Sequence, residues 1–184
     1  MKPSSVATAI ILGSLSLGVL AARSQNPQPQ MPMEPQTSLV TTQVPAPPEA
    51  LKITFGDKSA SWTVATLANL PHVTVTVYNE HIKANETYSG VPLIALLTPL
   101  GVNDKPRGKD LRLYVVAEGS DLYEAVFSSG EITPEVNSST VIVADTENGK
   151  PLTGDGPLKL IATGEKRPAR WVRSLVAIKV FAAE

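Results

Sequence analysis

The sequence contains no cysteine, and this absence excludes several kinds of chemistry at once. Without a thiolate, the protein has no cysteine nucleophile and no soft sulfur ligand for a transition metal. It also has no disulfide and no cysteine for lipid attachment near the N-terminus. A domain without disulfides depends on its buried core for stability, and about 135 residues from Glu49 onward are enough to build one.

The sequence also has few histidines and almost no net charge. His72 and His81 are the two histidines, and they do not supply the three or four ligands at regular spacing that a zinc site needs. No serine lies in a glycine-framed nucleophile turn. The net charge of -1 gives no general attraction to nucleic acids or anionic membranes, so any electrostatic recognition must be local.

Residues 1–24 have the pattern of a secretory signal peptide. Lys2 precedes an uncharged apolar run over residues 6–22, and the small residues Ala22 and Ser24 fit a cleavage site. The run lies near the lower length limit of a membrane-spanning helix, so an uncleaved anchor stays as the alternative. We expect an exported protein, periplasmic or extracellular, which contacts a membrane only if the leader is retained.

Residues 25–50 differ sharply in composition from the rest of the chain. Prolines alternate with glutamines and no apolar period is present, so this stretch cannot bury enough surface to fold. The composition predicts a disordered, extended linker. The linker either holds the following domain away from a membrane or wall, or has no role of its own.

Residues 51–184 have the patterns of one α+β domain with a mixed β-sheet and a few short helices. Alternating or continuous apolar residues predict strands at 51–55, 62–64, 72–78, 111–117, 122–127, 141–144, 158–162 and 175–181. A helix is predicted from Pro92 to Leu100, with short helical segments at 66–70 and, from the capping-box spacing of Ser128 and Glu131, at 131–135. Polar loops are predicted at 79–86 and 145–157.

Cationic side chains are concentrated between the last two predicted strands. Forked guanidinium donors beside a glycine suit a phosphate or carboxylate, and an adjacent indole can stack on a flat ring. The candidate ligand-binding residues are Gly164, Lys166, Arg167, Arg170, Trp171 and Arg173. In the alternative interpretation these arginines pair with Glu165, Asp155 or Glu147, and Trp171 belongs to the core.

Several segments, taken in order, resemble the molybdopterin-binding domain of the sulfite oxidase family. They are Tyr88-Ser89-Gly90-Val91-Pro92-Leu93, Ser120-Asp121-Leu122-Tyr123, Val143-Ala144-Asp145 with Asn148-Gly149-Lys150-Pro151-Leu152, Gly156-Pro157-Leu158-Lys159-Leu160, and Arg170-Trp171-Val172. The resemblance covers roughly residues 73–180. It implies a mixed α+β domain whose loops hold molybdopterin, with Lys166, Arg167 and Arg170 standing at the family's anion-contacting loop.

The chain departs from this family at the metal ligand. The family's molybdenum-ligating cysteine is expected at the end of the 72–78 strand, where this chain has Tyr78, Asn79 and His81. The leading hypothesis is therefore a catalytically silent relative that binds a pterin-like or other anionic ligand, or an exported protein partner. One alternative is a molybdenum oxidoreductase with a non-cysteine ligand, and another is a purely structural domain on a tether.

Overall fold

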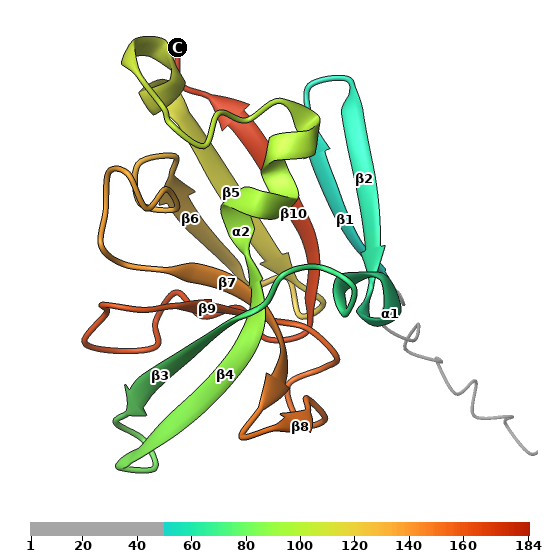
Figure 1. Cartoon of the computed structure of the whole chain (residues 1–184), viewed down its shortest axis with the longest axis vertical. Coiled ribbons are helices and arrows are strands. Elements are labelled where there is room, and N and C mark those ends of the chain that lie inside the picture. Colours follow the sequence, from blue (N-terminus) through green and yellow to red (C-terminus); the bar gives the residue numbers. More distant parts are fainter. Residues whose placement is uncertain (1–49) are drawn as a thin grey trace, which may run out of the picture. The chain divides into compact units, whose positions relative to one another are not determined.

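The computed structural model describes residues 50–184 of the chain (Figure 1). The predicted signal peptide and residues 25–49 of the predicted linker lie outside the described residues. No helix between residues 50 and 184 is both long and apolar enough to cross a membrane. The first strand begins at Ala50, one residue before the predicted start of the folded domain.

The first sheet combines strands from both ends of the described chain. Its order is β2-β1-β10-β5-β6, and its one parallel pair joins β1 to β10. The strands are β1 (Ala50–Phe55), β2 (Lys58–Thr63), β5 (Leu113–Gly119), β6 (Glu124–Ser128) and β10 (Leu175–Ala182). Pairing of β10 with β5, in which Leu175 lies opposite Gly119, places the loop before β10 next to the β5–β6 turn.

The second sheet is antiparallel throughout and contains the remaining strands. Strand β7 is central, since it pairs with β4, β8 and β9, while β3 pairs with β4. The elements are β3 (Val73–Asn79), β4 (Ala84–Pro92), β7 (Val141–Glu147), β8 (Lys150–Pro151), β9 (Lys159–Ala162), the helices α1 (Val64–Leu67) and α2 (Leu93–Leu97), and the 3-10 helices η1 (Thr98–Leu100) and η2 (Gly108–Arg112). The two mainly antiparallel sheets and few short helices confirm the predicted α+β class.

Leucines at helical spacing anchor α2 and the turn after it in the core, as predicted. Leu93, Leu96 and Leu97 are fully buried, and Leu100 is 3% exposed. Gly101 then ends the segment with a left-handed φ of 102°, a conformation that costs glycine little. The helix itself is shorter than predicted, because residues 98–100 tighten into a 3-10 turn.

The predicted loop at 79–86 is wrong beyond residue 83. Residues 84–92 form β4, which pairs with β3 around a turn at 80–83. The polar residues of β4 hid the strand, because Glu86 is buried and accepts hydrogen bonds from the Asn79 amide and the Tyr88 hydroxyl. Because the buried Glu86 interrupts the alternation of apolar residues in β4, the sequence pattern did not predict a strand there.

The predicted helix at 131–135 is wrong as well, because residues 129–136 form turns rather than a helix. The capping-box contacts do form: the Ser128 amide and hydroxyl donate to the Glu131 carboxylate at 2.8 and 3.0 Å. That carboxylate also accepts a hydrogen bond from Arg170, so the local motif serves a tertiary contact instead of a helix.

Candidate functional site

A cleft with a volume of about 410 Å³ lies where four chain segments of the described domain meet. These segments are the β3–β4 turn, the β5–β6 turn, the stretch entering β9, and the loop before β10. Its lining residues are Asn79, His81, Asp121, Tyr123, Asp155, Lys159, Pro168, Ala169, Trp171 and Arg173. The cleft therefore brings together both of the sheets and the predicted cationic loop.

Lys159 forms the polar floor of this cleft. The side chain is 8% exposed, and its ammonium contacts the Asp155 carboxylate at 2.5 Å. It also donates to the Tyr88 hydroxyl at 3.1 Å and lies 5.0 Å from the centre of the Tyr88 ring. A buried ammonium needs such compensation, because removing its hydration is costly. The Lys159 side chain is therefore held in place by Asp155 and Tyr88.

Tyr88 connects Lys159 to two carboxylates beneath the cleft. Its hydroxyl donates to Glu86 at 2.9 Å, and Glu147 accepts at 3.4 Å. Burial, together with the hydrogen bond to Glu86, raises the pKa of the Tyr88 hydroxyl far above its ordinary value. The phenol therefore stays protonated and is not available as a base.

Trp171 is mainly a core residue that presents one edge to the cleft. It is 9% exposed, its indole N–H donates to the Ala162 carbonyl at 2.9 Å, and its ring packs edge-on against Tyr88. The position in the core matches the alternative interpretation from the sequence. Little of the indole face remains for a ligand.

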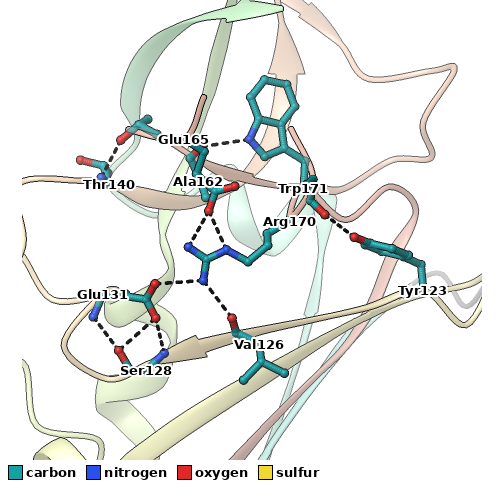
Figure 2. Close-up of polar contacts among 11 residues, drawn as sticks. Tyr123, Val126, Ser128, Glu131, Thr140, Ala162, Glu165, Arg170 and Trp171 are labelled. Carbon is teal, nitrogen blue, oxygen red and sulfur yellow. Dashed lines mark hydrogen bonds and ion pairs between the residues drawn. The ribbon is translucent and has the colours of Figure 1, made fainter. Parts of the chain in front are cut away.

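Arg170 does not line this cleft. Figure 2 shows its guanidinium between two carboxylates, with Glu165 at 2.7 Å from Nε and Glu131 at 2.9 Å from Nη1. The same Nη1 donates to the Val126 carbonyl, and the guanidinium lies 4.6 Å from the centre of the Phe127 ring. Gly164 lines a small hollow beside this arginine. Arg170 and Gly164 therefore lie outside the cleft.

The remaining predicted cations lie at or beside the cleft. Lys166 and Arg167 are exposed and, among residues 50–184, form no ion pair. They line an adjoining hollow of about 460 Å³, which shares His81 and Pro168 with the cleft. Arg173 lines the cleft itself; its side chain is 66% exposed and only 3.9 Å from Asp155 at its nearest. The three together form a cationic margin, in which Arg173 alone has an ion-pair partner among the described residues.

Two cleft residues, Lys159 and Tyr123, were absent from the candidates predicted from the sequence. Lys159 lies in β9, whose other residues are apolar and buried. No local sequence pattern indicates that the Asp155 carboxylate pairs with its charge. Tyr123 follows a turn and falls within the strand predicted at 122–127. A lysine within a buried apolar run is the one signal that could have indicated a buried charged network.

No family model and no curated protein sequence matches the chain. Among solved structures it is similar to the crystal structure of the sulfane dehydrogenase SoxCD from Paracoccus pantotrophus, with a TM-score of 0.55 and 23% sequence identity. The match covers 72% of this chain but only 38% of that chain, so this protein spans well under half of its neighbour's length. The likeness shows a shared fold, in agreement with the sulfite oxidase-like α+β domain expected from the sequence.

The residues at the expected metal position do not fit molybdenum. In the β3–β4 turn the Asn79 amide is used internally, because it donates to Glu86 and its oxygen accepts from the His81 backbone amide at 2.9 Å. Tyr78 is 53% exposed, and residues 50–184 contain no cluster of three metal-ligating side chains. The donor set lacks the thiolate that suits this metal. The cationic margin, in contrast, fits an anionic group.

Proposed function

We propose that this exported protein is a binding module for a small anionic, pterin-like ligand and does not catalyse oxo transfer. The ligand's ring occupies the cleft above Lys159, and its anionic group contacts Lys166 and Arg167 at the margin. The single observation that carries this proposal is the pair of cations, Lys166 and Arg167, that form no ion pair among residues 50–184 and line a hollow adjoining the cleft. Molybdopterin, if bound, would be held by the same residues through its pterin and phosphate.

The charge pattern supports binding rather than catalysis. Lys159 is paired with Asp155, and the Tyr88 phenol stays protonated, so neither group is ready to act as a general base. Lys166 and Arg167 can each donate charge-assisted hydrogen bonds to a phosphate or carboxylate, and neither forms an ion pair within residues 50–184, although Glu80 lines the same hollow. The fold alone does not determine function, so the proposal rests on these side chains.

The test is titration calorimetry on the full chain with two probes, pterin-6-carboxylate and pyrophosphate. We expect both to bind, and we expect the double variant Lys166→Ala/Arg167→Ala to lose at least about tenfold in affinity, since each charged hydrogen bond contributes about 1.5–3 kcal/mol before solvent screening. The matched control is Lys105→Ala/Lys109→Ala, which removes the same charge from exposed positions outside the cleft and should leave the affinity unchanged.

A melting curve gives an independent readout of the same proposal. A ligand at 100 times its dissociation constant adds about 2.7 kcal/mol to the free energy of unfolding. If neither probe changes the melting temperature or produces heat, the binding proposal is wrong, and a structural domain on a tether is the better description.

A further inference from the structure

The β5–β6 turn beside the cleft closes with the Gly119 amide donating to the Tyr123 carbonyl and the Leu122 amide donating to the Gly119 carbonyl, a hairpin geometry that places its last residue in the left-handed region. Leu122 has a left-handed φ of 66° and is 79% exposed. A leucine in this region costs free energy that glycine or asparagine would avoid, and its apolar side chain gains no burial here. Its neighbours Asp121 and Tyr123 both line the cleft, and Leu122 lies between them in the chain. Strain of this kind occurs preferentially at ligand-binding positions.

Tyr123 presents a fixed aromatic ring at the same rim. Its side chain is 45% exposed, and its hydroxyl donates a hydrogen bond to the Ala169 carbonyl across the cleft, as Figure 2 shows. Its backbone amide is held by the Asp121 carboxylate at 3.1 Å. The ring is therefore fixed at both ends, from the β5–β6 turn and from the loop before β10. A fixed ring loses little conformational freedom when a ligand stacks on it.

The turn itself is packed tightly against the opposite wall. A Cβ added at Gly119 would lie 2.7 Å from the Arg173 carbonyl, and the Ser120 amide donates to the Ser174 carbonyl at 2.9 Å. The turn therefore cannot move independently of the loop that bears Arg173. Leu122 and Tyr123 are held at a constant distance from the cationic margin.

We infer that Leu122 and Tyr123 form an apolar platform that selects a planar ring system within the ligand. This inference rests on the proposed binding function and assigns it two specificity-determining residues. The ring of the ligand stacks on Tyr123 and its edge contacts Leu122, while the anionic group lies toward Arg173 and Lys166. Trp171 does not take this role, because its faces are buried in the core.

The two probes separate ring recognition from anion recognition. We expect Tyr123→Ala to weaken pterin-6-carboxylate binding about tenfold or more, the usual consequence of losing one stacking aromatic. Tyr123→Phe keeps the ring and should stay within about fivefold of wild type, since it loses one neutral hydrogen bond. Pyrophosphate has no ring, so its affinity should be the same in all three proteins.

Leu122→Gly distinguishes a ligand contact from a structural role. Because glycine relieves the left-handed strain, we expect the melting temperature to stay equal or rise, while pterin-6-carboxylate binding weakens about fivefold. The control is Tyr114→Ala, which removes a tyrosine that stacks on Phe181 and does not line the cleft, and which should not change either affinity.

The outcomes separate this inference from the proposed function. If the pterin probe binds wild type, Tyr123→Ala and Leu122→Gly equally well, the platform assignment is wrong and the binding function stands. If neither probe binds the wild-type protein, the proposed function fails and the platform fails with it. Selective loss of the pterin probe in both variants supports the assignment.

Discussion

At the scale of single residues, His72 joins the start of β3 to the central strand β7. Its Nε2 lies 2.9 Å from the Asp145 carboxylate, and its Nδ1 lies 2.8 Å from the Leu70 carbonyl. Both ring nitrogens thus face acceptors, and only the protonated imidazole can donate to both. Asp145 is 6% exposed and its second oxygen has no partner within the described residues, so its charge depends strongly on this histidine.

This geometry predicts a pH dependence of stability. The hydrogen bond to Asp145, supported by the one to Leu70, raises the pKa of His72 above its ordinary value. A group whose pKa is raised by folding stabilises the folded state fully below the unfolded pKa, about 6.5, and loses this contribution as the pH rises through the folded pKa. We therefore expect the free energy of unfolding to fall as the pH rises above about 6.5 in denaturant titrations.

His72→Gln provides the comparison for that titration. The glutamine amide can donate to Asp145 but does not titrate, so the difference in stability between wild type and variant isolates the histidine. The difference should be largest at low pH and shrink as the pH rises. A difference that stays constant across this range would show that His72 does not change its protonation.

At the scale of elements, the approach of β4 to β7 depends on Gly90. A Cβ at this position would lie 2.2 Å from the Val143 carbonyl oxygen and 2.5 Å from the Ala144 Cα, and both atoms belong to the backbone. The pairing of the two strands also shifts register between Ser89 and Gly90. Gly90 therefore serves the close contact between two strands.

We expect Gly90→Ala to destabilise the domain by about 3 kcal/mol or more, because two backbones would have to separate in a packed core. Gly154→Ala is the control, since a Cβ there meets nothing within 4 Å and the backbone is not left-handed. That change should be neutral or slightly stabilising. Denaturant unfolding of the two variants measures both effects, and equal stabilities would contradict the close approach.

At the scale of the whole molecule, the sequence predicts most of the strands and the core but little of the charge pairing. The alternating valines of β3 predict a strand, and the helical spacing of the leucines in α2 predicts a helix, each from its own short segment of sequence. Arg170 and Glu131 are 39 positions apart in the sequence. No local pattern therefore shows that Arg170 pairs with this carboxylate instead of contacting a ligand. The cluster predicted as one anion site is therefore divided, with Lys166, Arg167 and Arg173 near the cleft and Arg170 elsewhere.

Arg170 connects the two sheets of the domain. It lies in the loop that follows β9 of the second sheet, pairs there with Glu165, and donates to the Val126 carbonyl on the outer edge of β6 in the first sheet. Its contact with Glu131 adds the turn after β6. An arginine at an edge strand also blocks that edge against pairing with other chains. These contacts make Arg170 a structural residue of the fold.

We expect Arg170→Ala to lower the free energy of unfolding by about 2 kcal/mol, a value reduced for partial solvent exposure, because charged hydrogen bonds and a cation–π contact are lost together. Arg170→Lys keeps the charge but not the forked geometry, so it should recover less than half of the loss. Arg167→Ala, which removes an unpaired exposed arginine, should change stability by less than about 0.5 kcal/mol. If Arg167→Ala destabilised the protein as much as Arg170→Ala, the division of the cationic loop into a structural and a binding part would be wrong.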